Sequence, residues 1–404
     1  MLLKKHSFRE MGDKIWEYVN GLYQPGDRFP YPLQEGNKGT LLGTIFASLI
    51  AYMLGKEQDL KGMSHIIDEI LDIEDTKTGL FKDPDINSNS FLQPEIHSPI
   101  YVSLQTTYFC RACLQSLGLK LDHGVSWVLD LLPEGNLEKW LNSLNWKDPW
   151  LVSNIDMFTG IFLLEFQQMG LENDNIKDGV KRYFQWHDKN QSGKTGFWGN
   201  EDDYLNLMAG GYHIILHYDF YNQKLNHIKQ IIDTTLSLPW KDGLFVYGGG
   251  GGSCEDMDAI DILVRLSQYD SYRNENIKQT LQNASKMLII GQNNDGGFGW
   301  RIQPTTGRLL NLITNNEFKT QSLIGLLYSG AFKIMHRSHF NSTFYYSSLA
   351  TYPFCLNKSD MWSTWFRALS LALIARRYPD LYFEKCNWKF PFWPGLGCDP
   401  FTII

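Results

Sequence analysis

The chain has 404 residues and a formal net charge of −7, and 43% of its residues are hydrophobic. The negative charge and the lack of a basic stripe argue against nucleic acid as a partner, while the hydrophobic fraction is sufficient for a large core. Aromatic residues make up 14% of the chain, more than packing alone usually requires, so we expect some of them to line a cavity.

Cysteine usage and the N-terminal residues indicate the compartment. Six scattered cysteines do not make a disulfide framework, and the pair Cys110 and Cys113 has no second pair to complete a zinc site. The first twenty residues lack the apolar stretch of a signal peptide, and no apolar run approaches the ~18 residues of a membrane span. We therefore expect a cytoplasmic protein without cofactor or metal. Peripheral membrane contact and oligomeric state are left open.

Taken in chain order, the sequence consists mainly of apolar segments with helical spacing. These segments cover residues 39–54, 104–117, 155–169, 205–218, 259–268, 320–335 and 361–375. Alternating apolar and polar runs, which are typical of strands, are scarce. The pattern predicts an all-α protein.

A short corner motif recurs between these helices, and it combines a polar residue, a glycine and an aromatic residue. It occurs at Thr78-Gly79-Leu80-Phe81, Thr195-Gly196-Phe197-Trp198, Asp242-Gly243-Leu244-Phe245 and Asp295-Gly296-Gly297-Phe298. The last three are about 50 residues apart, the length of a helix-pair repeat. We predict a single (α/α)6 barrel over residues 1–404, with glycine-rich loops at one end, a lead-in over 1–38 and a tail over 376–404. An open solenoid is the alternative.

The most informative segment is a run of five glycines followed by acids. Residues 248–252 cannot hold a helix or strand, because each glycine costs backbone entropy there. Glu255, Asp256 and Asp258 follow at the start of the helix predicted over 259–268. One acid at this place is explained by helix capping and the helix dipole, but three exceed what a cap needs. The excess predicts a functional site.

Two segments carry a resemblance to known families. Gln292 and the Asp295-Gly-Gly-Phe-Gly-Trp300 run resemble the repeat shared by protein prenyltransferases and squalene-type cyclases. Asp256-Met257-Asp258-Ala259 resembles the Asp-x-Asp-Asp motif of class II terpene cyclases, with Ala259 in place of the last Asp. The resemblance covers about residues 185 to 300. It implies a monodomain class II cyclase of the type linked to bacterial meroterpenoids.

In such an enzyme the middle acid of the motif starts the reaction. The resemblance therefore implies that Asp258 protonates a terminal alkene or epoxide of a hydrophobic polyprenyl substrate, with or without an aromatic head. The donor must be a neutral acid, and burial beside Asp256 and Glu255 raises its pKa. Glu255, Asp261 or Cys254 takes the place of the missing third Asp, and His213 is the candidate to polarise and reload the donor.

The cyclisation also needs a lining that does not quench cations. Desolvated aromatic faces stabilise a cation by roughly 1–2 kcal/mol each. The candidates for this lining are Tyr212, Trp198, Tyr247, Trp362 and Trp365. Arg367 and Lys319 are candidates to anchor a polar head group, and His97 is a candidate to face the cavity.

Other functions stay open at this stage. Zinc-dependent prenyl transfer would use Cys254, Asp256 and His213 as ligands, but that family has Asp two residues before Cys, where this chain has Gly252. A glycan-active (α/α)6-barrel enzyme also combines aromatic platforms with paired carboxylates. A binding module without catalysis is the third alternative, and the clustered acids argue against it.

Overall fold

The computed structural model describes residues 7–86, 99–302, 343–344, 351–352, 354–356, 358–381, 384–390 and 395–400. Helices dominate these residues, and the strands among them form two small antiparallel sheets, β1–β2 and β3–β4. The predicted all-α character is therefore confirmed. The helix predicted over 320–335 lies outside the described residues.

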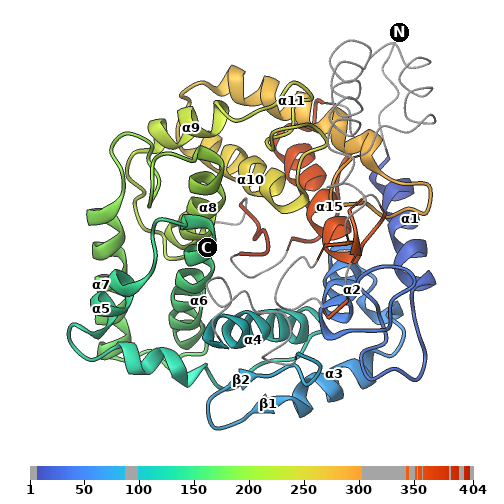
Figure 1. Cartoon of the computed structure of the whole chain (residues 1–404), viewed down its shortest axis with the longest axis horizontal. Helices are drawn as coiled ribbons and strands as arrows, with labels where there is room; N and C mark the ends of the chain where they lie inside the picture. Colours follow the sequence, from blue (N-terminus) through green and yellow to red (C-terminus); the bar gives the residue numbers. More distant parts are fainter. Residues whose placement is uncertain are drawn as a thin grey trace. The chain divides into compact units, whose positions relative to one another are not determined.

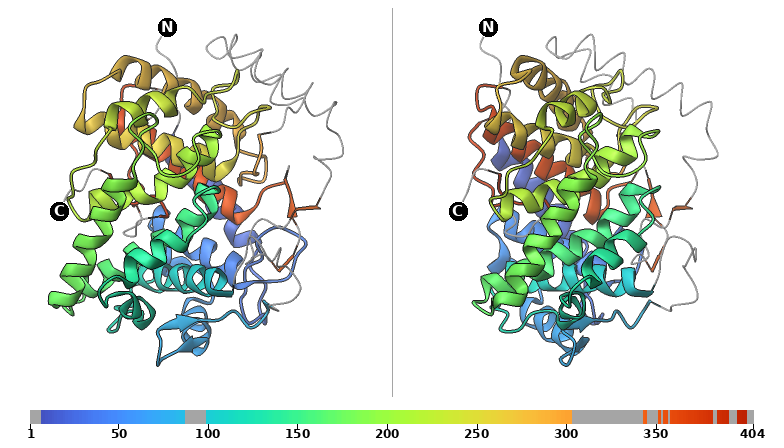
Figure 2. Two further views of the ribbon diagram at one scale, coloured as in Figure 1. Left: turned by 60° about the vertical axis from the view of Figure 1, so that its left-hand side comes forward. Right: turned by 90° about the vertical axis from the view of Figure 1, so that its left-hand side faces the viewer.

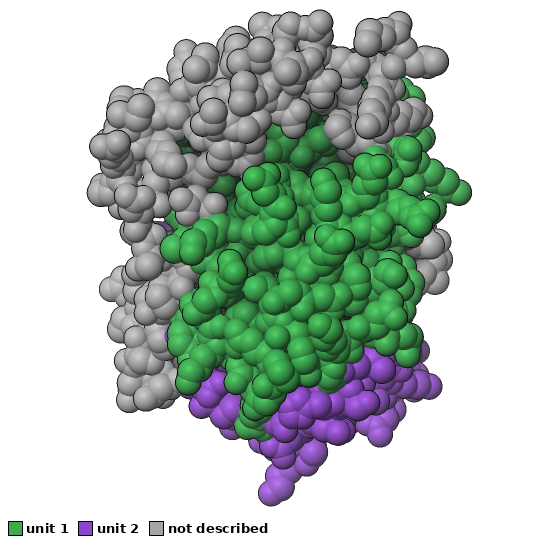
Figure 3. Space-filling view, turned by 90° about the vertical axis from the view of Figure 1, so that its right-hand side faces the viewer, with its two compact units in different colours: residues 1–62, 235–346, 352–390 green, residues 63–234, 347–351, 391–404 purple. Residues whose placement is uncertain are grey.

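The chain divides into two compact units, each assembled from discontinuous segments (Figure 3). Unit 1 comprises residues 1–62, 235–346 and 352–390, and unit 2 comprises residues 63–234, 347–351 and 391–404. One barrel domain over the whole chain stays a prediction. Its lead-in over 1–38 contains a helix, α1, which is capped by Ser7 and packs against α2.

The described part of unit 1 is built around three almost wholly buried helices. Its elements are α1 (Phe8–Gly21), α2 (Leu41–Leu54), η1 (Glu57–Asp59), α10 (Ser253–Tyr269), α11 (Asn274–Gly291), β3 (Thr343–Phe344), β4 (Phe354–Cys355) and α15 (Met361–Arg377). The buried helix α15 packs against both α10 and α2 (Figure 1). The amphipathic helices α1 and α11 cover them from outside, because each has one apolar face.

Unit 2 repeats this arrangement of buried and amphipathic helices. Its elements are α3 (Met63–Asp72), β1 (Glu74–Asp75), β2 (Leu80–Phe81), α4 (Pro99–Ser116), η2 (Ser126–Leu131), α5 (Asn136–Ser143), α6 (Pro149–Gln168), α7 (Asp174–Asn190), α8 (Tyr204–Phe220) and most of α9 (Ile228–Leu236). Helix α6 packs along α8 and also contacts α4 (Figure 2). Helix α7 packs on α6 with its apolar face.

The predicted apolar segments correspond to the buried helices of both units. The segments 39–54, 104–117, 155–169, 205–218, 259–268 and 361–375 become α2, α4, α6, α8, α10 and α15. Helix α6 begins earlier than predicted, because the Asp148 side chain caps it and Pro149 suits its first turn. In the described part of the chain, no helix is both long and apolar enough to cross a bilayer.

The corner motifs are turns with a shared geometry. Their glycines have positive φ in all four cases: Gly79 (71°), Gly196 (79°), Gly243 (90°) and Gly296 (93°). The side-chain amide of Gln191 donates to the carbonyl oxygen of Gly196 at 2.8 Å, and Gln292 does the same to Gly296 at 2.9 Å. A glutamine thus holds one corner in each unit, at Gly196 in unit 2 and at Gly296 in unit 1.

In unit 1 one further contact joins each buried helix to the corner or loop that precedes it. The side chain four residues after the N-cap accepts a hydrogen bond from a backbone N–H of the corner or of the preceding loop. The pairs are Thr44 with Tyr31 (3.1 Å) on α2, Asp256 with Phe245 (2.8 Å) on α10, and Thr364 with Phe298 (2.9 Å) on α15. We call this the corner-binding position. Helix α10 has a carboxylate where its two neighbours have threonine.

Candidate active site

The five-glycine loop is shaped by the carboxylates beneath it. Gly248 to Gly251 all have positive φ, which glycine adopts without strain. A Cβ added at Gly251 would overlap Oδ2 of Asp256, and a Cβ added at Gly252 would overlap Oε2 of Glu255. These two positions therefore require glycine because acidic side chains occupy the adjacent space.

Asp256 is fully buried and held by three donors. Oδ1 accepts the Phe245 N–H at 2.8 Å, and Oδ2 accepts the Gly252 N–H at 3.1 Å and Nη1 of Arg367 at 2.6 Å. Burial raises the pKa of Asp256, whereas the guanidinium and the two N–H groups favour its charged form. Because the guanidinium is permanently charged, we assign Asp256 as the ionised partner of Arg367.

Arg367 holds the loop and does not reach out to a substrate. It is completely buried, and Nη2 donates to the carbonyl oxygens of Gly250 (3.1 Å) and Trp300 (2.7 Å) while Nη1 binds Asp256. The predicted role of Arg367 as an anchor for a polar head group does not fit this position. Its two terminal nitrogens join α15 to the glycine loop and to the segment after the last corner.

Asp258 lies in a different environment although it is only two residues from Asp256. Its side chain is 3% exposed, and to the described residues it makes no hydrogen bond and no ion pair. Burial raises the pKa of Asp258 well above its usual range, and Glu255, Asp261 and Asp256 raise it further by like-charge repulsion. Burial and like charges therefore favour the neutral form of Asp258, whereas Asp256 is paired with a guanidinium.

The helix position of Asp258 is aromatic on the neighbouring helices. Six residues after the N-cap, α2 has Phe46 and α15 has Phe366, where α10 has Asp258. The rings of Phe46 and Phe366 are 6.0 Å apart, and Trp362 packs against them at 4.8 and 5.1 Å. The acid thus occupies the position that its neighbours use for an aromatic cluster. Trp362 belongs to this cluster, whereas Trp365 is completely buried in the core.

Glu255 and Cys254 lie at the start of the same helix. The Glu255 side chain is half-buried, and its Oε2 accepts a hydrogen bond from Sγ of Cys254 at 3.4 Å. Burial raises the pKa of Glu255 to about 7, with the Asp256 charge acting in the same direction. Both protonation states of Glu255 are consequently populated near neutral pH.

The predicted site residue His213 belongs to unit 2. Nδ1 of His213 lies 2.9 Å from Oγ of Ser153, and the Ser153 hydroxyl donates to the Trp150 carbonyl oxygen at 2.9 Å. The Ser153 oxygen therefore accepts a hydrogen bond from the Nδ1–H group of His213, which leaves Nε2 without a proton and able to accept. Burial lowers the pKa of His213 to about 3, so the ring is neutral. Its pairing with the acids of unit 1 stays a prediction.

The other predicted lining residues have varied surroundings. Tyr212 and Trp198 are buried in unit 2, and Trp198 uses its indole N–H to bind the His187 carbonyl oxygen at 2.8 Å. Tyr247 is 66% exposed and packs edge-on against Trp240, so it does not fit the predicted role in a water-poor cavity. His97 and Lys319 lie outside the described residues.

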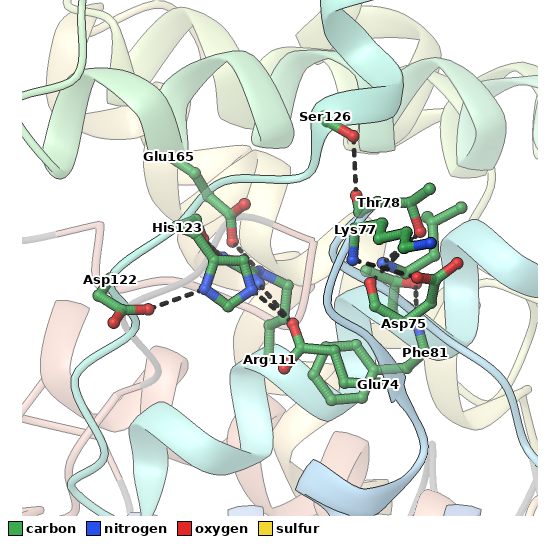
Figure 4. A network of polar contacts seen from close by, with 12 residues as sticks. Glu74, Asp75, Lys77, Thr78, Phe81, Arg111, Asp122, His123, Ser126 and Glu165 are labelled. Carbon is green, nitrogen blue, oxygen red and sulfur yellow. Dashed lines mark hydrogen bonds and ion pairs between the residues drawn. The ribbon is translucent and has the colours of Figure 1, made fainter.

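Sequence reasoning missed a buried ion-pair network in unit 2 (Figure 4). Nε of Arg111 binds Glu165 at 2.7 Å, and Nη2 donates to the His123 carbonyl oxygen at 2.6 Å. Nε2 of His123 lies 2.6 Å from Glu74, whose carboxylate is also 3.9 Å from Arg111. Burial raises the pKa of Glu165 to about 7. An arginine inside the apolar segment 104–117 was the available signal for this network.

A second missed network joins α6, α7 and α8. The Tyr183 hydroxyl is 3.1 Å from Asp156 and 2.8 Å from Nδ1 of His217, and His187 lies 3.2 Å from the same carboxylate. Gly160 makes room for it, because a Cβ there would overlap the His217 ring. All four polar side chains are buried, so the network joins the three helices inside unit 2.

Within the described ranges, no group of three or more His, Cys, Asp or Glu side chains is arranged to hold a metal ion. Cys254 and Asp256, two of the three candidate zinc ligands, have other partners: Cys254 bonds Glu255, and Asp256 bonds Arg367. The arrangement in unit 1 therefore gives no support to a zinc site.

No protein-family model matches the sequence, and no curated protein matches it with significant similarity. The resemblance to class II cyclases consequently depends on the acidic motif and the corner repeat. The chemistry of the site has to be argued from its residues.

Proposed function

We propose that the protein is a class II terpene cyclase in which Asp258 is the general acid. The observation that carries this proposal is that Asp256 and Asp258, two acids on α10, differ in whether a counter-charge lies beside them. Arg367 neutralises Asp256, whereas Asp258 is buried without a counter-charge. A carbon–carbon double bond is a very weak base, so its protonation needs a neutral acid in a dry environment.

The reaction is a proton-initiated isomerisation. The Asp258 hydroxyl gives its proton to the less substituted carbon of the terminal double bond of a polyprenyl chain, and the π electrons form the new C–H bond and leave a tertiary cation on the other carbon. The next double bond attacks the resulting cation and closes a ring, and loss of a proton ends the sequence. Phe46 and Phe366 stand at the same helix position as Asp258, and Trp362 packs against them. In the proposed reaction the face of each ring stabilises a desolvated cation by about 1–2 kcal/mol.

We also propose that the buried helices form the inner layer of an (α/α)6 barrel. Both units alternate buried helices with amphipathic ones, and glutamine-fixed corners occur in both. This repetition supports the barrel, because a helix that is apolar on all sides must be covered on all sides. In this arrangement the substrate is a hydrophobic isoprenoid enclosed by the inner helices.

The experiment is turnover of farnesyl- and geranylgeranyl-type substrates, with and without aromatic heads, in deuterated water. We expect a product isomeric with the substrate except for one solvent deuteron on the carbon that Asp258 protonates. Asp258→Asn should abolish turnover and leave the circular dichroism spectrum unchanged. Asp13→Asn, a substitution of an exposed acid on α1, is the matched control. Full activity of Asp258→Asn, or a product without deuterium, would refute the proposal.

One observation favours a glycan-active enzyme as the second candidate. Tyr247 directly precedes the glycine loop, is exposed and packs against Trp240, as in an aromatic platform for a sugar. Release of reducing sugar from oligosaccharides that depends on both Tyr247 and Asp258 would support this candidate over cyclisation.

A further inference from the structure

The buried helix α6 presents rows of side chains to three other helices of unit 2. The contacts that mark these rows are Asp156 with Tyr183 on α7, Gly160 with His217 on α8, and Phe158 with Tyr108 on α4. At about 3.6 residues per turn, Met157 lies about 60° from the Gly160 row and about 100° from the Phe158 row. Met157 is therefore on the arc of α6 between α8 and α4, and the row that faces α7 is not on this arc.

The C-terminal segment 395–400 packs on this arc. A Cβ added at Gly395 would lie only 2.4 Å from Sδ of Met157 and 3.0 Å from the hydroxyl oxygen of Tyr108. The Gly395 backbone thus rests directly against side chains of both α6 and α4. The segment belongs to unit 2, as the two helices do. It lies on the side of α6 that the amphipathic helix α7 leaves uncovered.

An irregular segment in this position is unusual. Chain ends and segments without regular structure generally lie at the surface, where water satisfies their backbone groups. Here Leu396 and Cys398 are each 1% exposed, and Gly397 and Pro400 are buried as well. Gly395 and Gly397 have φ values of 92° and 79°, so the backbone turns twice within three residues. The segment is therefore folded onto the buried helices and does not trail over the surface.

The same arc of α6 changes from open to closed along the helix. Trp150 and Asn154 precede Met157 on this arc, and Ile161 follows it, at the spacing of one helix face. Trp150 is 39% exposed and Asn154 is half-buried, whereas Met157 is 3% and Ile161 is 1% exposed. The change occurs at the level where Gly395 meets α6. The segment thus lies where the open first turns of the helix end.

We propose that the C-terminal segment 395–400 is the floor of the substrate-binding chamber and limits the length of the isoprenoid chain that the protein accepts. This inference rests on the proposed function, in which the inner helices enclose the substrate. The first turns of α6 leave room for a hydrocarbon chain, and from Met157 onward the segment takes up the space. Protein interiors are close-packed, so a longer chain fits only where the floor gives way. The segment acts through its volume and takes no part in proton transfer.

Variants of Leu396 test this role, because its side chain is apolar, buried and next to Gly395. One methylene more or less in an apolar pocket changes kcat/KM by about 10–200-fold. Leu396→Ala should therefore raise the ratio of kcat/KM for a geranylgeranyl-type over a farnesyl-type substrate at least about tenfold, and Leu396→Trp should lower it by a similar factor. Leu171→Ala, at an exposed leucine of unit 2, is the matched control and should leave the ratio unchanged. A side chain with only a packing role lowers both kcat/KM values together and leaves the ratio constant.

A labelling experiment tests the contact itself and needs no turnover. The full-length Asp258→Asn protein is irradiated with a geranylgeranyl-type substrate that carries a diazirine at its head end, and the digested protein is analysed by mass spectrometry. The head end carries the label because the opposite end has the double bond that Asp258 protonates. We expect labelled residues within 395–400, and we expect an excess of unlabelled substrate to suppress this labelling.

The outcomes separate this inference from the proposed function. If the parent protein converts isoprenoids, an unchanged length preference in both Leu396 variants overturns the role of the segment. Labelling only outside residues 395–400 overturns it too, and this result decides alone if the Leu396 variants do not fold, because the segment is unaltered in the labelled protein. Full activity of Asp258→Asn, or conversion of no isoprenoid by the parent protein, refutes the proposed function, and the role in chain length is refuted with it.

Discussion

Replacing Arg367 by methionine leaves the Asp256 carboxylate in the interior of unit 1 without its counter-charge. The substitution removes the 2.6 Å contact to Asp256 and the donors to two backbone carbonyl oxygens, while it keeps most of the side-chain volume. Loss of one partner of a buried ion pair costs about 3–5 kcal/mol. For a unit of about 200 residues this lowers the melting temperature by about 10 °C.

The matched variant is the double substitution Arg367→Met with Asp256→Thr. It restores the threonine that α2 and α15 have at the corner-binding position and removes the unpaired charge. We expect it to be more stable than Arg367→Met alone, with a coupling energy of about 2 kcal/mol. Thermal unfolding at pH 7, followed by circular dichroism, gives the stability loss of each variant and the coupling energy between the two substitutions. A loss below about 1 kcal/mol for Arg367→Met, or additive effects, would contradict the assignment of Asp256 as ionised.

Two further predictions concern stability. Gly251→Ala should destabilise the protein by about 2 kcal/mol or more, since the new Cβ overlaps Asp256 at a positive φ, whereas Gly21→Ala, where a Cβ meets nothing, should have almost no effect in the same melting assay. Because the pKa of Asp258 is raised on folding, its contribution to stability falls as pH rises above ~4, the ordinary Asp pKa. Asp258→Asn should therefore gain stability over the parent protein as pH rises above ~4, and urea midpoints with a pH-independent difference would contradict this.

The sequence was sufficient to locate the buried helices and the corners. The apolar segments 39–54 and 361–375 predict α2 and α15 because a helix buried on all sides is apolar on all sides. The corner glycines were visible because glycine at a positive φ is a local requirement. Both signals are contained within a few consecutive residues.

The hydrogen-bond and ion-pair partners of the acids could not be predicted from the sequence in the same way. Asp256 and Arg367 are 111 positions apart, and nothing in either neighbourhood indicates that they meet. The same applies to Arg111 and Glu165, which are 54 positions apart. Pairing depends on how helices pack, so the partners of Arg367 could not be predicted from the sequence, while its buried helix was predicted correctly.

The role of the five-glycine run could be predicted only in part. Residues 248–252 were correctly predicted to be irregular, but the reason why two of them must be glycine became visible only with the carboxylates of Asp256 and Glu255 in place. Tyr247, next to this loop, was expected inside a cavity and lies at the surface. A single aromatic residue in a loop carries no periodic signal for burial.

The central claim is that Asp258 is a neutral acid at physiological pH, and infrared spectroscopy tests it without any substrate. The difference spectrum between the parent protein and Asp258→Asn isolates the signal of this one side chain. At pH 7 it should contain the C=O stretch of a protonated carboxyl group, which converts to the carboxylate bands only well above the ordinary Asp pKa. Carboxylate bands already present at pH 7 would contradict the account.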